Sequence, residues 1–336
     1  MLRGIGMYSF MKFVAKKVVF YGFVAFVALN FAFFIPRITP GDPISRLIPP
    51  TAYVPGMNIT AIREYYKKLW GMDKPLFPDQ YLKFWGQVLT LDLGPRMGRQ
   101  WPRPVAEAVM ACLPYTFALV IPVLVVSFIL GNWIGAKAAY MGGKWSELIY
   151  FYSVFSNRLP YFWLLMVLVF LLARQAKLFP PVYLEYPTWW DFDVFIKMLR
   201  YWFLPFLSLF IVYLGGWATG MRAMVIHEMD SGYVRYAEQL GFKKKKVMSY
   251  AQRNAILPQF TGINLYLNAL IGETAIVEMI YAWPGIGTLL YDAVTNFDSP
   301  TIIGCFIILM IVITFGNFLV DVLYGFVDPR IRIGRG

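Results

Sequence analysis

The sequence predicts an all-α membrane protein with six transmembrane helices. Of its 336 residues, 59% are hydrophobic and 15% are charged, a balance too apolar for a soluble domain of this length. Six segments are long and apolar enough to cross a bilayer, which takes about 20 residues each. Lysine and arginine gather in alternate connections between these segments. This topological bias accounts for the net charge of +12, so we expect no nucleic-acid partner.

The first expected span is an uncleaved helix. It is too long for the apolar part of a signal peptide, and Pro36 and Arg37 follow it where a cleavage site would need small residues. The six expected spans are residues 18–35, 116–138, 148–173, 203–224, 262–282 and 302–327.

The distribution of basic residues predicts that both termini are cytoplasmic. Four basic stretches fall on one side of the membrane if there are six spans: residues 1–17, the connection after the second span, the segment after the fourth span, and the tail 328–336. The short opposite connection, 283–300, has no lysine or arginine, whereas the connection between the third and fourth spans has four, which weighs against the assignment. The resulting organisation is a cytoplasmic N-terminus 1–17, a first span 18–35, an extracytoplasmic loop 36–115, a five-span core 116–327 with a cytoplasmic loop 229–258, and a cytoplasmic tail 328–336.

The extracytoplasmic loop is expected to contain short helices between turns. Residues 62–69 form an amphipathic stretch, and 101–113 read as a short helix lying at the outer surface. The later outer connection is rich in aromatic residues between 183 and 192. These aromatics fit either an interfacial belt or a docking surface for an outer partner.

The polar cytoplasmic loop 229–258 predicts a helical knob. Asp230 or Ser231 can cap a helix, and Gly241 can supply the left-handed residue that ends it. A second helix is expected over 243–256, with Pro258 marking its end or a kink into the fifth span. The apolar stripe of the first helix is Tyr233, Tyr236, Ala237 and Leu240. Periodicity alone leaves open whether this knob rests on anionic lipid or docks on a protein.

Polar residues also lie within the expected spans, where they are costly and usually face a cavity or a partner. Asn264, Asn268 and Gly272 recur every four residues on the fifth span, which also holds Glu273 and Glu278. This face either lines a translocation path or meets a partner, or it supplies structural hydrogen bonds between helices.

The sequence contains no catalytic signature. It has no G-x-x-x-x-G-K-[ST] motif, because Gly142-Gly143-Lys144 is followed by Trp145. One histidine and two cysteines offer few metal ligands. We therefore expect neither an enzyme nor a bound cofactor or metal on this chain.

Four motifs resemble the permease subunits of ABC transporters, and more narrowly the oligopeptide and dipeptide import class. GYVRYAEQLG followed by RNAILPQ resembles the cytoplasmic EAA loop of that family. The PGDP turn at 40–43, the segment 276–287 and the C-terminal segment 320–332 also match, in the same order. One departure is that the Glu-Ala-Ala triplet is replaced by Arg235-Tyr236-Ala237.

The resemblance implies the type I ABC importer permease fold, in a multi-pass protein of a prokaryotic plasma membrane. It implies four kinds of partner besides the bilayer: a second homologous permease, two cytoplasmic P-loop ATPases that hold ATP and magnesium, and an extracytoplasmic solute-binding protein. The implied ATPase contact is Tyr233, Arg235, Tyr236, Ala237, Gly241 and Pro258; the path or partner face is Asn264, Asn268, Gly272, Glu273 and Glu278; and the outer turn is Trp283, Pro284, Gly285 and Gly287.

The substrate stays open between oligopeptides and oligosaccharides. Residues 215–218 and 253–259 look more like the sugar-importing branch of the class. The alternative reading is an ion-coupled secondary transporter, which would predict inverted repeats and broken helices. We find no convincing internal repeat in the sequence.

Overall fold

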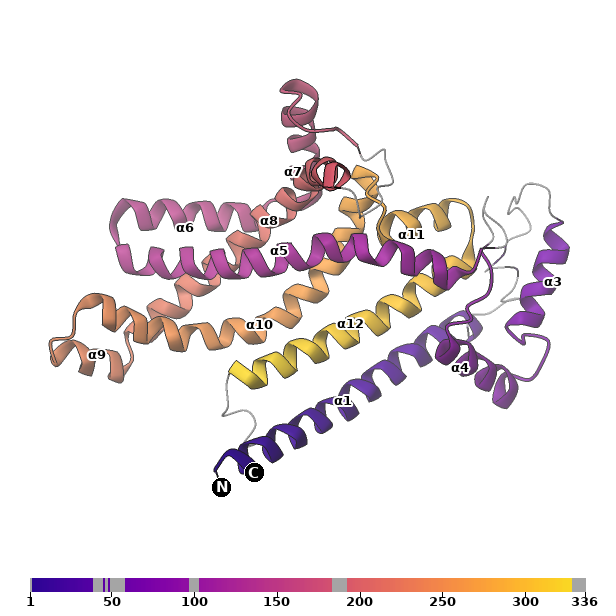
Figure 1. Cartoon of the computed structure of the whole chain (residues 1–336), viewed down its shortest axis with the longest axis horizontal. Coiled ribbons are helices and arrows are strands. Elements are labelled where there is room, and N and C mark those ends of the chain that lie inside the picture. The colour runs from indigo at the N-terminus through magenta and orange to yellow at the C-terminus, as the bar shows by residue number, and fades with distance from the viewer. Residues whose placement is uncertain are drawn as a thin grey trace. The chain divides into compact units, whose positions relative to one another are not determined.

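The computed structural model is helical and describes residues 2–38, 45, 48, 58–96, 103–182 and 192–327. Five of its helices are long and apolar enough to cross a membrane, or six if one bent pair counts as a single span. The elements follow the chain as shown in Figure 1. Contacts divide them into two compact units, residues 1–115 with 284–319 and residues 116–283 with 320–336. The predictions about the aromatic loop, the PGDP turn and the C-terminal tail concern residues that lie wholly or almost wholly outside the described part of the chain.

The first unit is built on α1, Leu2–Ile38, and on the outer segment that follows it. Asn58 caps α3, Ile59–Leu69, by accepting a 2.9 Å hydrogen bond from the Thr60 amide. The predicted amphipathic stretch is thus a helix, which buries Ile62 and Tyr66. The other elements of this unit are the π-helix η1, Leu76–Gln80; α4, Tyr81–Thr90; α11, Ile286–Thr295; and the first parts of α5, Val105–Met141, and α12, Ser299–Val327.

The second unit surrounds α8, Phe192–Met229, which packs against α6, α7 and α10. Glycine allows α5 to approach α8 closely, because a Cβ at Gly135 would lie 2.3 Å from the carbonyl oxygen of Ala218. The other helices of this unit are α6, Gly143–Arg158; α7, Tyr161–Leu168; the π-helix η2, Val169–Gln175; α9, Gly232–Gln239; and α10, Lys244–Tyr281.

The expected third span is bent rather than one continuous helix. Residues 148–173 were expected to form one helix, but α6 ends at Arg158 and α7 begins at Tyr161, with a bend of 100° between them. Pro160 explains the break, because it disfavours helical geometry at Leu159, which is extended with ψ 132°. Arg158 is exposed at the end of α6.

Two further boundaries differ from the expectation. The separate surface helix over 101–113 is absent within the described residues, because α5 runs without a break from Val105 into the second span. The second helix of the cytoplasmic knob does not end near Ile256, because α10 is continuous from Lys244 to Tyr281 and contains Pro258. Both predicted short helices are therefore the end segments of long ones.

Candidate functional site

The predicted knob is a hairpin made by α9 and the first turns of α10, residues 229–251, called the α9–α10 hairpin below (Figure 1). Ser231 occupies the N-cap position of α9 with extended backbone angles, φ −69° and ψ 148°. Its side chain makes no capping hydrogen bond, so the predicted position of the cap is correct and its predicted bond is not formed. The Ser231 amide instead donates to the Glu228 carbonyl at 3.0 Å.

Gly241 ends α9 with the left-handed backbone that the sequence predicted, at φ +77°. The Phe242 amide donates to the Ala237 carbonyl and the Gly241 amide to the Glu238 carbonyl, at 3.3 and 2.9 Å. These two bonds are the pattern of a Schellman motif, which satisfies the last carbonyls of the helix. A residue with a Cβ would be strained at this position even though no atom lies within 4 Å of it. The turn is therefore set by its own backbone rather than by packing around it.

The inner face of the α9–α10 hairpin is a small apolar core. Val234 and Ala237 of α9 are 0% and 5% exposed and pack on Val247 and Ala251 of α10. The predicted stripe had placed Ala237 on the docking face, and the structure corrects this: Ala237 holds the two helices together. Val234 was missed because the spacing of the tyrosines dominated the pattern, although its position three residues before Ala237 marks the same face.

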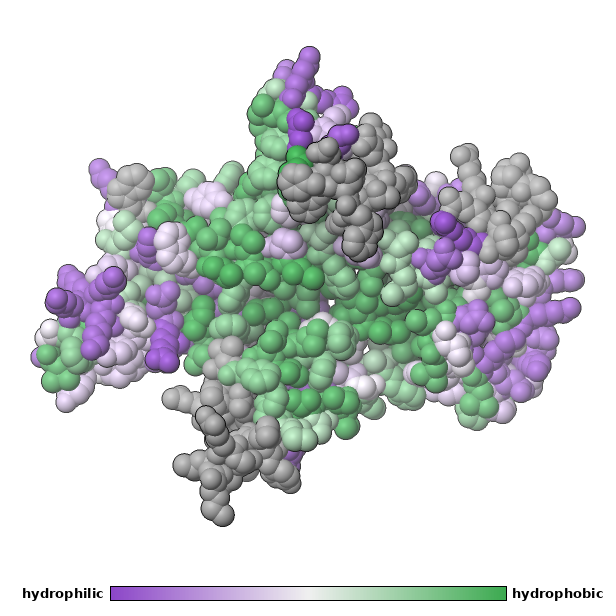
Figure 2. Space-filling view, viewed as in Figure 1, coloured by the Kyte–Doolittle hydropathy of each residue, from purple (hydrophilic) through white to green (hydrophobic). Residues whose placement is uncertain are grey.

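The outer face of the hairpin carries large apolar side chains that are exposed among the described residues. Tyr236, Leu240 and Phe242 are 62%, 56% and 40% exposed. Charged residues surround them, and Figure 2 shows hydrophilic side chains gathered over α9 and the start of α10. An apolar centre with a charged rim is the usual composition of a protein interface. The rim includes Arg235, Glu238 and the four lysines 243–246.

Two polar contacts flank this face. The Tyr233 hydroxyl donates to a Glu228 carboxylate oxygen, and burial together with this hydrogen bond raises the pKa of Tyr233. Arg235 pairs with Asp230 at 3.5 Å, but both side chains are mostly exposed. Exposed pairs of this kind contribute little to stability, so Arg235 stays available to a partner.

Pro258 lies inside α10 rather than at its end. The Thr261 hydroxyl donates to the Pro258 carbonyl at 2.6 Å. On the adjacent turn, Gln259 is buried against Gly220 of α8, where a Cβ would lie 3.1 Å from the Gln259 amide nitrogen. The helix that begins in the hairpin is therefore fixed to α8 at the level of Pro258.

The predicted polar face of the fifth span is divided in the structure. The Asn264 amide donates to Asp321 of α12 at 2.7 Å, so this residue forms a bond between helices. Asn268 and Gly272 are exposed, and a Cβ at Gly272 would meet no atom within 4 Å. Glu273 lies beside the hydroxyl of Tyr213 on α8, whereas Glu278 is fully buried. Only Asn268 and Gly272 of this set are openly accessible.

The turn predicted after the fifth span connects α10 to α11. Ala282, not a glycine, takes the left-handed conformation after α10, with φ 54°. Trp283 is fully buried, and its amide donates to the Glu278 carbonyl at 2.9 Å. Gly285 caps α11 with an extended backbone, and Gly287 lies inside that helix. The predicted turn is therefore present at Trp283, Pro284 and Gly285, and only Gly287 lies beyond it, in the first turn of α11.

Among the described residues, no group of three or more histidine, cysteine or acidic side chains could hold a metal ion. The arrangement offers a docking surface on a rigid hairpin, continuous with a transmembrane helix. Such a surface can transmit a mechanical displacement but has no group placed for bond chemistry.

The chain is similar to known proteins of one kind. Residues 127–333 match the family described as the binding-protein-dependent transport system inner membrane component. The chain is 30% identical to an oligopeptide transport system permease protein of Bacillus subtilis, over 90% of this chain and 93% of that protein. It is 27% identical to a probable D,D-dipeptide transport system permease protein of Escherichia coli, over 90% and 92%, and to a putative peptide transport system permease protein of Brucella abortus, over 92% and 95%.

These matches extend over nearly the full length of each relative and include the hairpin and the helix that leads from it. They agree with the family expected from the four sequence motifs, and they give no support to an ion-coupled transporter. The chain belongs to the family of binding-protein-dependent transport system inner membrane components, and it is a multi-pass permease subunit of an ABC importer.

Proposed function

We propose that this chain forms half of the translocation pathway of a peptide importer, paired with a second homologous permease. Two cytoplasmic ATPases would drive the pair, and an extracytoplasmic binding protein would deliver the substrate. In this arrangement the N- and C-termini are cytoplasmic, and the α9–α10 hairpin faces an ATPase.

The observation that carries the proposal is the outer face of the hairpin. Tyr236, Leu240 and Phe242 are exposed on a turn whose backbone is fixed by the Schellman motif and whose inner face is packed. A rigid, aromatic-rich surface with a charged rim suits a groove on a partner protein, because little conformational entropy is lost when it binds.

The hairpin is also built to transmit force. Because α10 is continuous from Lys244 to Tyr281, a push on the hairpin acts directly on the helix that carries Asn268 and Gly272. The contact of Gln259 with Gly220 passes the same displacement to α8. ATP-driven closure of the ATPases would therefore move two transmembrane helices together, which is the motion that alternating access requires. We propose that ATP and magnesium are held by those ATPases.

Peptides are the substrate class that we propose, because all three relatives described above carry peptide transport in their names. Specificity would lie mainly in the binding protein. Titration of that protein with dipeptides, oligopeptides and oligosaccharides tests the assignment. Binding of oligosaccharides without binding of peptides would overturn the peptide assignment and leave the permease assignment intact.

Replacement of Gly241 by valine tests the coupling role. A β-branched residue in the left-handed region costs about 1–2 kcal/mol, which would reshape the turn and displace the docking face. We expect loss of ATP-driven uptake while membrane insertion is retained, with weaker recovery of the ATPases when the transporter is purified.

Gly142→Val is the matched control. Gly142 has φ +62°, ψ −177° and open space around it, a conformation almost restricted to glycine, so the variant strains a different turn at least as strongly. We expect uptake to persist in this control. Normal uptake by Gly241→Val, or equal loss in both variants, would contradict a specific role for the hairpin turn.

A further inference from the structure

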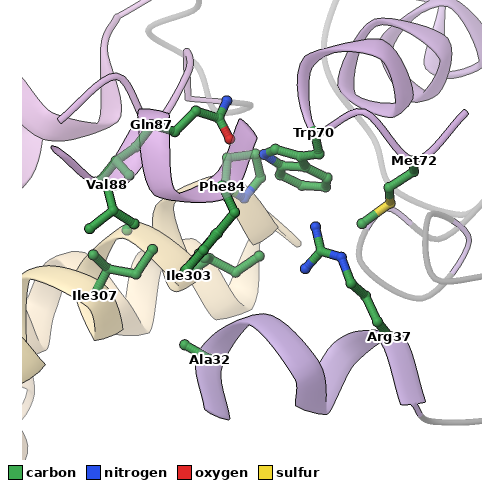
Figure 3. A pocket seen from close by; sticks show the side chains of 12 residues that line it. Ala32, Arg37, Trp70, Met72, Phe84, Gln87, Val88, Ile303 and Ile307 are labelled. Atoms are coloured by element: carbon green, nitrogen blue, oxygen red, sulfur yellow. The ribbon is translucent and has the colours of Figure 1, made fainter. Parts of the chain in front are cut away.

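The outer segment of the first unit contains a helix whose packing differs from that of a water-exposed helix. One face of α4 is buried, with Phe84 and Val88 only 9% and 6% exposed. Figure 3 shows Val88 close to Ile307 and Phe84 close to Ile303, both on α12, with Ala32 of α1 on the other side of the same pocket. The buried face of α4 therefore contacts two helices that are long and apolar enough to cross the membrane.

Contacts with α1 place α4 at the depth of the bilayer. Trp85 stacks on Phe26 with ring centroids 5.3 Å apart, and Phe84 lies 5.2 Å from Phe33. The apolar segment of α1 is 26 residues long, Phe10–Ile35, or about 39 Å of helix. If that segment is centred on a hydrocarbon core of about 30 Å, Phe26 lies roughly 9 Å inside the core boundary. Trp85 therefore reaches hydrocarbon depth.

The opposite face of η1 and α4 is apolar and uncovered. Phe77, Leu82 and Leu89 are 72%, 65% and 79% exposed. On α1, Phe31 and Ile35, two residues before and after Phe33, are also exposed, at 60% and 62%. Exposure of these side chains to water would be unfavourable, because each Å² of exposed apolar surface costs about 25 cal/mol.

Three polar side chains of α4 bond to backbone carbonyls within the protein, whereas the buried Nε1 of Trp85 has no hydrogen-bond partner among the described residues. Lys83 donates to the Lys68 carbonyl and Gln87 to the Leu69 carbonyl, both at the C-terminal end of α3. Thr90 donates to the Gly86 carbonyl in its own helix. Internal satisfaction of polar groups is what an apolar medium demands of a helix that faces it. The Lys83 ammonium is also favourably placed, because the C-terminal end of a helix attracts cations.

We propose that η1 and α4 form an interfacial segment whose exposed face, Phe77, Leu82 and Leu89, is embedded among phospholipid acyl chains. The leaflet is the one that holds the Ile35 end of α1, which is the outer leaflet in the proposed topology. Asp79 and Asp92 lie near the two ends of the segment, and the charged residue between them, Lys83, bonds to the Lys68 carbonyl. The segment ties the connection between α1 and α5 to the membrane surface and sets the height of α3 above it.

Lipid is the favoured occupant because the exposed face has no polar centre and Trp85 of the same helix lies beside Phe26, within the apolar segment of α1. Collision measurements on nitroxide labels in the assembled transporter, reconstituted in phospholipid vesicles, test this directly. Cys112 and Cys305 are first replaced by serine, and labels are then attached through Leu89→Cys and, as a control, Lys67→Cys. Lys67 is exposed on α3.

We expect the label at position 89 to collide several-fold more often with oxygen, which concentrates in hydrocarbon, than with a water-soluble nickel chelate. The label at position 67 should show the reverse. Dominant collisions with nickel at position 89 would place α4 in water, and low collision rates with both reagents would place it under a partner protein; either result overturns the proposal. Leu82→Cys lies on the same face and provides the same readout if Leu89→Cys fails to assemble.

Discussion

The α9–α10 hairpin and the η1–α4 segment are both short helical elements that expose large apolar side chains. They differ in the environment of their polar side chains. In the hairpin, charged residues surround Tyr236 and Leu240 and stay exposed. In α4, Lys83 and Gln87 are bonded to backbone carbonyls of α3. This difference is why we propose a protein partner for the hairpin and lipid for α4. Exposure of apolar side chains alone would not have separated the two.

The largest expected effect comes from the core of the hairpin. Val234→Asp places a carboxylate in a site that is fully buried against Val247 and Ala251, at a cost of about 3–5 kcal/mol. We expect the hairpin to open locally, with loss of uptake and faster proteolysis at the lysines 243–246. Val234→Ile keeps the site apolar and serves as the control. Unchanged proteolysis in the aspartate variant would show that this core does not hold the hairpin.

A charge exchange between the two regions is expected to have the next largest effect. Leu89→Lys would place an ammonium group at the lipid-facing surface and lower the stability of the reconstituted protein by about 2 kcal/mol. Tyr236→Lys adds the same charge to a water-exposed face and should change stability by less than about 0.5 kcal/mol. Thermal unfolding in lipid nanodiscs measures both. Equal melting temperatures for the two variants would remove the distinction between the faces.

Truncation of the hairpin surface should weaken ATPase binding without unfolding anything. Tyr236→Ala and Leu240→Ala each remove a large exposed contact, and we expect each to lower affinity about tenfold, equivalent to about 1.4 kcal/mol. Affinity of the purified permease for its ATPase provides the measurement. Leu89→Ala is the matched truncation in the other region and should leave that affinity unchanged. A similar loss in Leu89→Ala would point to a general defect.

The smallest expected effect concerns the ion pair of Arg235 with Asp230. Both side chains are well exposed, so Asp230→Asn should change unfolding stability by less than about 0.5 kcal/mol. A larger change in the melting temperature would mean that this ion pair stabilises the fold of the hairpin.

The sequence predicted the spans better than the joints between them. Five of the six apolar segments that hydropathy located lie in helices long enough to cross a membrane. In the sixth, hydropathy could not reveal the 100° bend after Arg158, because a bent and a straight apolar helix have the same composition. Pro258 was read as a boundary, whereas α10 continues through it, which proline permits when neighbouring groups satisfy the freed backbone. Local preference was decisive only where one residue type was required, as at Gly241 with φ +77°.

The sequence predicted the position of the α9 helix, but it did not predict which face of that helix is buried. The tyrosine spacing identified α9, but it did not show that Ala237 points inward with Val234, because the buried face depends on the later residues Val247 and Ala251. The α4 helix was not predicted. Its apolar residues lie on both faces, which is the signal that could have identified it, since a helix apolar on all sides is buried or in lipid.

Photo-cross-linking tests the central claim most directly. A benzophenone-bearing phenylalanine is placed at position 236 or position 89 in the assembled transporter, and the products are separated by mass. The account predicts that position 236 yields an adduct with the mass of the permease plus an ATPase subunit, and that position 89 yields only permease with bound lipid. An ATPase adduct at position 89, or only lipid adducts at position 236, would contradict it.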